Sequence, residues 1–313
     1  MKVLVVGAGR MGLRHLRGLA EVTDDVHVVD PREEARRAAG AQASYATLED
    51  ALRETRYDAA VLAETADGRL ERLRALLATG VRSILVEKPV EQSRERVRAA
   101  LAAATAPGAD VRVNHFLRTL PLFEGLLALG GPFLASVVGG AYGLACNGIH
   151  WIDLVRHLSG DGGGRLSFGE LDDTPIASGR GKRFRDYGGD AVFGFEDGSR
   201  LFLSSGPTSS APMQVTIVQP AAATVLFPHD GAAVAYRRDA TVDKPPFLYG
   251  ADYERSEMPA LGADDLTRST ERWARAVAAG EPPPHPSLES SARSHELLFD
   301  LLELSGDHEF PIT

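Results

Sequence analysis

Cysteine is almost absent from this chain of 313 residues, which contains only Cys146. A single thiol excludes an internal disulfide and a zinc cluster built from cysteines, and it is typical of proteins from a reducing cytosol. No apolar run approaches the ~18 residues that a membrane span needs. Residues 1–6 also lack the apolar stretch and cleavage site of a signal peptide. We therefore expect a cytoplasmic protein without a membrane segment.

Excess positive charge is missing as well, because 34 lysines and arginines are set against 43 acidic residues, for a net charge of −9. This balance argues against nucleic acid or an anionic membrane as a partner. The histidines show no His-Glu-x-x-His pattern or other ligand spacing, so we expect no metal. With 44% hydrophobic residues, the chain is long enough for one large domain or two.

Lysine is scarce, with four lysines against 30 arginines. One of the four, Lys88, lies in Glu87-Lys88-Pro89, directly after the apolar run 83–86. Arginine does not release its proton in proteins, whereas a lysine in a dry pocket can do so. In a chain that prefers arginine, a lysine at this position indicates a function that needs a transferable proton. The alternative is a chance occurrence of one cation.

The first third of the chain carries a dinucleotide-binding pattern. The apolar run 3–6 predicts a central parallel strand, and Gly7-Ala8-Gly9-Arg10-Met11-Gly12 follows at once and begins a helix that extends to about residue 20. In G-x-G-x-x-G the first glycine permits the tight turn, the second lets the backbone approach a pyrophosphate, and the third allows close packing of helix and strand. Asp30 ends the next strand, 26–29, where an acid accepts from a ribose hydroxyl, although it is also placed to cap a helix.

Strand and helix patterns then alternate as far as residue 114. This alternation predicts a doubly wound parallel sheet, so the fold class is α/β with an N-terminal Rossmann domain. Ligands of such sheets bind outside the carboxyl ends of the strands. The residues expected at this edge are Gly7, Asp30, Thr65, Glu87, Lys88 and Asn114.

After residue 114 the pattern changes to short strands separated by turn signals. It predicts an α+β domain with a large, open, mostly antiparallel sheet covered on one face by helices. We expect a Rossmann domain over residues 1–115 and a substrate-binding and oligomerisation domain over 116–313. The amphipathic helix expected at 287–304 is predicted to pack back on the first domain.

A second polar cluster lies in the segment 146–153. Asn147 is a suitable N-cap, so His150 falls in the first turn of a helix, where the positive end of the helix dipole favours neutral imidazole. Asp153 lies one turn later, where it either orients His150 or pairs with Arg156. Cys146 is expected to be a small buried apolar residue.

These motifs together resemble those of the Gfo/Idh/MocA oxidoreductases, the relatives of glucose–fructose oxidoreductase and inositol dehydrogenase. The resemblance covers nearly the whole chain. It rests on the glycine motif, Glu87-Lys88-Pro89, the segment 114–118 with Pro121, Gly148-Ile149-His150 with Asp153, and the segment 285–289.

The resemblance implies hydride transfer between a nicotinamide and a secondary alcohol or ketone of a sugar, nucleotide sugar, amino sugar or cyclitol. It implies Lys88 as proton donor or acceptor, assisted by His150, and subunits that associate as a homodimer or homotetramer through the C-terminal sheet. Cofactor contacts are expected from Gly7, Gly9, Arg10, Met11, Gly12, Asp30, Arg32, Thr65, Glu87 and Lys88. Substrate contacts are expected from Asn114, Arg118, Tyr142, Asn147 and Asp153.

Two departures from the family pattern leave alternatives open. Cys146 occupies the position of an Asp that often precedes the catalytic His, and Ala66 and Leu70 replace the Pro and His that often follow Thr65. The alternatives are a catalytically silent nicotinamide-binding regulator, or an enzyme that uses transient oxidation with a tightly bound cofactor for elimination or epimerisation. Asp30 favours NAD, whereas Arg32 leaves NADP possible, since it can partly compensate a 2′-phosphate.

Overall fold

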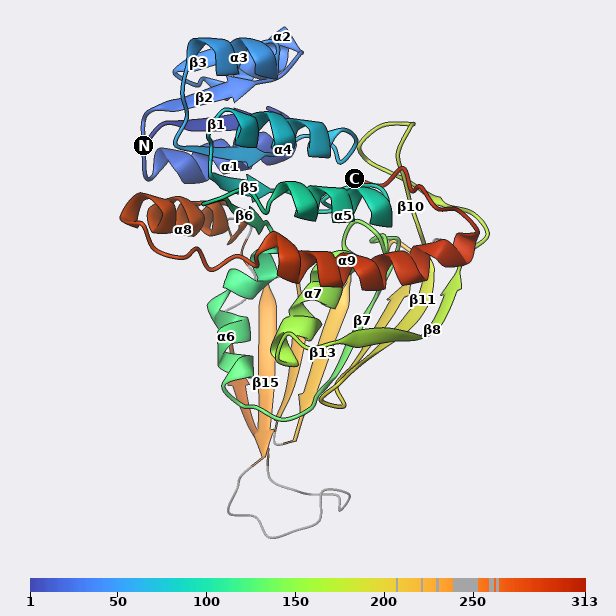
Figure 1. Ribbon diagram of the computed structural model, residues 1–313. Coiled ribbons are helices and arrows are strands. Elements are labelled where there is room, and N and C mark those ends of the chain that lie inside the picture. The colour runs from blue at the N-terminus through green and yellow to red at the C-terminus, as the bar shows by residue number, and fades with distance from the viewer. Residues whose placement is uncertain (207, 221, 229–230, 239–252, 259–261, 263–264) are drawn as a thin grey trace.

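The first part of the chain forms a parallel six-stranded sheet. The computed structural model describes residues 1–206, 208–220, 222–228, 231–238, 253–258, 262 and 265–313 (Figure 1). The strand order is β3-β2-β1-β4-β5-β6, which confirms the doubly wound sheet. The strands are β1 (Val3–Val6), β2 (Val26–Val29), β3 (Ala43–Tyr45), β4 (Ala59–Leu62), β5 (Ser83–Val86) and β6 (Asp110–Val113).

Five helices connect these strands: α1 (Arg10–Ala20), α2 (Glu33–Ala39), α3 (Leu48–Glu54), α4 (Arg69–Ala78) and α5 (Arg94–Ala103). Helices α3 and α5 begin where the side chains of Thr47 and Ser93 accept a hydrogen bond from the backbone N–H three residues later. The central strands β1 and β4 are buried along their whole length, as expected for strands covered on both faces.

The second part is built on an eight-stranded sheet in the order β16-β15-β14-β13-β7-β12-β11-β8. All neighbours are antiparallel except β7 and β12, so the mostly antiparallel sheet is confirmed. Its strands are β7 (Leu134–Gly139), β8 (Gly164–Leu171), β11 (Gly189–Phe195), β12 (Arg200–Ser205), β13 (Gln214–Gln219), β14 (Ala222–Phe227), β15 (Ala232–Arg238) and β16 (Tyr253–Glu257). The last of these, β16, was not predicted from the sequence.

A small hairpin, β9 (Ile176–Ala177) with β10 (Arg185–Asp186), lies outside the large sheet and was also not predicted. Three short helical elements precede it: η1 (Phe116–Thr119), α6 (Pro121–Leu127) and α7 (Gly148–Leu158). Helix α7 is buried over most of its length, from Gly148 to Arg156. No helix in the described part of the chain has the length and apolar character to cross a membrane.

The last two α-helices join the two halves of the molecule. Helix α8 (Asp265–Ala279) packs against α1, and its fully buried Trp273 belongs to the hydrophobic cluster beneath β1 and β4. Helix α9 (Leu288–Leu302) lies between α5 and the large sheet in Figure 1, and it contacts α5, α7 and β8. Arg94 of α5 pairs with Asp300 of α9 at 2.9 Å and with Glu303, which begins η2 (Glu303–Ser305), at 3.1 Å.

Candidate functional site

A cavity of about 1110 Å³ lies at the carboxyl ends of the parallel strands. Of the residues expected at the cofactor, it is lined by Gly7, Gly9, Arg10, Asp30, Arg32 and Thr65. Gly12 lies behind the turn, where a Cβ atom would come 1.9 Å from the carbonyl oxygen of Gly7. This contact leaves no room for a side chain, so helix α1 begins directly against the turn and presents its N-terminus to the cavity. The cradle fits the pyrophosphate of a dinucleotide.

Asp30 is buried at the end of β2 and is held by Arg32. Its Oδ2 accepts from the backbone N–H of Ala8 at 2.9 Å, and Arg32 donates to both carboxylate oxygens at 3.0 Å. Burial opposes the charged form, but the hydrogen bonds from Arg32 and Ala8 outweigh it, so the pKa of Asp30 is lowered. A fixed carboxylate at this position fits a ribose 2′-hydroxyl.

A second cavity, of about 450 Å³, lies between the Rossmann sheet and α7. Arg10, Gly179 and Arg180 line both cavities, so the two adjoin. The second cavity contains most of the other predicted residues: Met11, Glu87, Lys88, Asn114, Tyr142, Asn147 and His150. The fold therefore brings Lys88, at the end of β5, and His150, on α7, to one cavity.

Lys88 is held by the turn that precedes α7. Its Nζ donates to the carbonyl oxygen of Cys146 at 2.6 Å and lies 3.7 Å from the Cys146 Sγ. Cys146 is only partly buried and lines the cavity, so the expectation of a buried apolar residue is wrong. Its backbone carbonyl, rather than its side chain, makes the short contact with the lysine.

The neighbouring Glu87 belongs to a buried polar network. Its Oε1 accepts from Asn114 Nδ2 at 2.6 Å and lies 2.9 Å from His15 Nε2. Burial raises the pKa of Glu87, but the bonds from His15 and Asn114 and the charge of Lys88 reverse this effect and lower it to about 2. Glu87 thus remains ionised, and it fixes the orientation of Asn114 beside the cavity.

His150 is buried and neutral. Burial is the main cause that lowers its pKa well below the usual value, and the charges of Lys88 and His115 act in the same direction. Its ring lies edge to face on Phe116 at 5.0 Å, and its Nδ1 has no hydrogen-bond partner among the described residues. A neutral imidazole with an unpaired nitrogen can donate or accept a hydrogen bond within the cavity.

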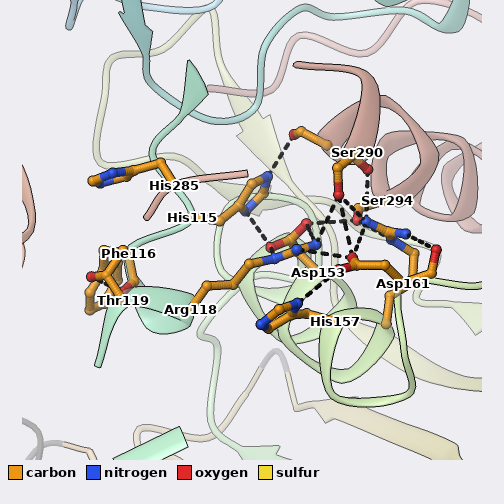
Figure 2. A network of polar contacts seen from close by, with 12 residues as sticks. His115, Phe116, Arg118, Thr119, Asp153, His157, Asp161, His285, Ser290 and Ser294 are labelled. Carbon is orange, nitrogen blue, oxygen red and sulfur yellow. Dashed lines mark hydrogen bonds and ion pairs between the residues drawn. The ribbon is translucent and has the colours of Figure 1, made fainter. Parts of the chain in front are cut away.

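Arg118 and Asp153, which were expected to contact substrate, line neither of the two cavities but belong to a buried polar network. Arg118 Nη2 donates to Asp153 Oδ1 at 2.8 Å, and its Nη1 donates to Asp161 Oδ1 at 3.0 Å (Figure 2). Ser294 of α9 donates to Asp153 Oδ1 at 2.8 Å. Asp153 therefore neither orients His150 nor pairs with Arg156, whose partner is Asp161 at 2.9 Å. The network anchors α7 to η1 and α9.

Two further predicted residues make local contacts. Asn147 is the N-cap residue of α7, but its side chain donates to the Tyr142 carbonyl instead of capping the helix. The Tyr142 hydroxyl donates to the carbonyl of Val137 at 3.3 Å, and burial raises the pKa of this hydroxyl. Both residues shape the cavity wall, and Asn147 holds the turn ahead of α7.

Several residues near the two cavities were not predicted from the sequence, and four of them are His15, Arg180, Arg183 and Asp186. Arg180 and Arg183 lie between β9 and β10 and line the cofactor cavity, and Arg183 pairs with Asp67 of the Rossmann domain at 3.0 Å. None of the four lies in a motif or at a strand end of the parallel sheet. Only the packing of distant segments brings them to the site.

Metal ligation has no support in the described residues, where no group of three His, Cys, Asp or Glu side chains could hold an ion.

Comparison with known proteins agrees with this geometry. The family of oxidoreductases with an NAD-binding Rossmann fold, GFO_IDH_MocA, matches residues 1–115. A search of curated proteins gave no match.

Solved structures match over nearly the full length. UDP-N-acetylglucosamine 3-dehydrogenase GnnA from Acidithiobacillus ferrooxidans has a TM-score of 0.76 at 17% identity, with 97% of each chain covered. GenD2 from gentamicin A biosynthesis, in complex with NAD, has a TM-score of 0.70 at 21% identity, covering 98% of this chain and 94% of its own. The 3-ketoreductase KijD10 from Actinomadura kijaniata, in complex with TDP-benzene and NADP, has a TM-score of 0.68 at 20% identity, with 95% of each chain covered. Residues 1–115 therefore match the model of the Gfo/Idh/MocA oxidoreductase family with its NAD-binding Rossmann fold, and the whole chain has the fold of these solved structures.

Proposed function

We propose that this protein is an NAD(P)-dependent oxidoreductase that interconverts a secondary alcohol and a ketone on a sugar-like substrate. One observation carries the proposal: Lys88 and His150 line a single cavity that adjoins the cofactor cavity. Nicotinamide supplies the hydride chemistry, and the protein must place the substrate carbon and move one proton. A lysine and a neutral histidine are suited to that proton transfer.

We assign the proton transfer to Lys88 and the orientation of the reacting hydroxyl to His150. The Lys88 ammonium donates to the Cys146 carbonyl and has further N–H groups that can donate to a substrate oxygen. His150 lines the cavity, and its Nδ1 has no hydrogen-bond partner among the described residues, so the ring is free to turn toward a substrate hydroxyl. Asn114, Tyr142 and Asn147 are the further candidates for substrate contact. Retention of both Lys88 and His150 argues against a silent regulator.

A nucleotide-linked or amino sugar is the substrate class that we favour. GnnA acts on a UDP-linked sugar, and KijD10 was crystallised with a TDP compound. The arginines Arg10, Arg14 and Arg180 around the second cavity suit a substrate with phosphate groups.

A substrate panel tests this proposal. We expect turnover, followed by nicotinamide absorbance, with at least one UDP- or TDP-linked hexose or its keto form, and weaker turnover with free sugars and cyclitols. If NAD binds but no member of the panel reacts in either direction, the silent regulator is the better description. Cofactor that is retained through purification and regenerated within each turnover would instead favour elimination or epimerisation.

NAD should be preferred over NADP by about tenfold or more in kcat/KM, equivalent to about 1.4 kcal/mol. The reason is that the ionised Asp30 repels a 2′-phosphate, while Arg32 offsets only part of this repulsion. Replacement of Asp30 by Asn should reduce the preference for NAD, measured as kcat/KM with NAD divided by kcat/KM with NADP. Higher kcat/KM with NADP in the unchanged protein would contradict the assignment.

Association of copies through the outer face of the large sheet is part of the same proposal. Leu134 of β7 pairs with Val218 of β13, and both side chains are exposed. Phe168 and Tyr236 are exposed on the same sheet. Apolar side chains gathered on a sheet are typical of an interface between subunits. A cytoplasmic location, indicated by the single cysteine, completes the proposal.

A further inference from the structure

Asp186 is a buried carboxylate beside Lys88 that no motif predicted. It ends β10, and its side chain lines the second cavity although only 8% of the residue is exposed. Forty positions separate it from Cys146 in the sequence. An ionisable side chain this deeply buried is costly unless its neighbours satisfy it.

Two backbone amides of the turn before α7 and the amide of the next residue, Tyr187, satisfy the carboxylate. Oδ1 accepts from the N–H groups of Ala145 and Tyr187, both at 2.8 Å, and Oδ2 accepts from the N–H of Cys146 at 3.1 Å. Gly143 lies against the same carboxylate: a Cβ atom there would come 2.1 Å from Oδ2, and the residue has a φ of +82°. The turn is thus folded tightly around Asp186.

The same turn holds Lys88, because the carbonyl that accepts from Lys88 Nζ belongs to Cys146. One residue therefore uses its N–H to bind Asp186 and its C=O to bind Lys88. The carboxylate and the ammonium also interact electrostatically across the cavity. Position 146 itself carries no carboxylate.

We propose that Asp186 is the positioning residue for Lys88: it fixes the Gly143–Cys146 turn whose carbonyl holds the ammonium in the cavity. This inference rests on the proposed function, in which Lys88 moves the proton. Movement of the turn by about 1 Å would displace the ammonium from the reacting oxygen, and such displacements cost up to ~100-fold in rate.

Protonation of Asp186 provides a way to detect its influence on Lys88. Burial raises the pKa of Asp186 to about 6, although three backbone hydrogen bonds and Lys88 oppose the shift. Lys88, Cys146, Arg10, Arg14 and Arg180 share the cavity with Asp186. Of the other ionisable side chains there, Glu87 has its pKa lowered to about 2, His150 has its pKa well below the usual value, and Tyr142 has its pKa raised, so none of these three titrates near pH 6. When Asp186 is protonated, it has one acceptor fewer for the amides of the turn, and the turn is held less firmly. The surroundings of the Lys88 ammonium should therefore change near pH 6.

The kinetic test compares Asp186→Asn with the control Asp307→Asn. Asp307 lies away from the cavity and pairs with Arg185, the neighbour of Asp186 in β10. We expect Asp186→Asn to lower kcat by ~10- to 100-fold while the Kd for NAD changes less than twofold. Asp307→Asn should leave both unchanged. Normal kcat in Asp186→Asn, or a loss of rate that only follows lost NAD affinity, would overturn the proposal.

A second test needs no substrate. The chain has four lysines, so carbon-13-labelled lysine in the NAD-bound protein gives few side-chain signals, and Lys88→Arg identifies that of Lys88. Its signal should show a step near pH 6 that is retained in Asp307→Asn and absent in Asp186→Asn. Absence of the step in the unchanged protein overturns the coupling even if Asp186→Asn does not fold. A clear step without turnover on any sugar would instead refute the proposed function alone.

Discussion

Replacement of Lys88 by Ala should reduce kcat by at least ~10³-fold while NAD still binds, since positioned acid–base groups contribute about 10²- to 10⁴-fold. Lys88 lies in the second cavity, whereas the cofactor cavity is lined by the glycine turn and Asp30. We therefore expect the Lys88→Ala variant to lose turnover and to keep cofactor binding. Nicotinamide absorbance measures turnover, and a fluorescence titration of NADH measures binding.

Two variants give the Lys88 experiment its controls. Lys2→Ala removes a surface lysine whose Nζ lies 3.8 Å from Asp25 Oδ2. This variant should leave kcat unchanged. Lys88→Arg keeps the charge but not the transferable proton, and it should remain as impaired as the alanine variant. If Lys88→Ala retained near-normal turnover, proton transfer by this residue would be excluded.

Gly12→Ala should abolish cofactor binding at concentrations that saturate the unchanged protein. The new Cβ atom would lie 1.9 Å from the Gly7 carbonyl oxygen, so either the turn or helix α1 must move. Overpacking of this kind typically costs ~1–3 kcal/mol of folding stability. It would also displace the N–H groups at the start of α1 that are expected to bind the pyrophosphate. Thermal unfolding and NADH titration measure the two effects.

The matched control is Gly125→Ala in helix α6, where no atom lies within 4 Å of the new Cβ. Because glycine weakens a helix by about 0.5–1 kcal/mol relative to alanine, this variant should be neutral or slightly more stable. Equal NAD affinity in Gly12→Ala and the unchanged protein would show that the turn can open without harm.

The sequence allowed the Rossmann sheet to be predicted because its signals are local. Each strand is a short apolar run, each crossover is a helical segment, and glycines mark the first turn. The hairpin of β9 and β10 escaped detection because two-residue strands have no periodicity. The segment that follows β15 lies outside the described residues until β16 begins at Tyr253.

Side-chain partners were harder to predict than strands. Spacing correctly placed His150 and Asp153 on neighbouring turns of α7, but it could not show that Arg118 approaches Asp153 from η1. His15 and Glu87 are 72 residues apart, and only the packed fold brings them together. The expected topology did predict that Lys88 lies at the ligand-binding edge of the sheet, because the carboxyl ends of parallel strands meet at one edge.

The packing of α8 and α9 has a consequence for how the chain folds during synthesis. The Rossmann strands emerge first from the ribosome, yet Trp273, which completes the hydrophobic cluster on α1, follows more than 150 residues after β6 ends at Val113. Ribosomes add about 5–20 residues per second, so the apolar face of α1 is exposed for seconds before α8 is synthesised and can bury it. The domain that is synthesised first is thus completed last, and this interval is when the nascent chain most needs protection from aggregation.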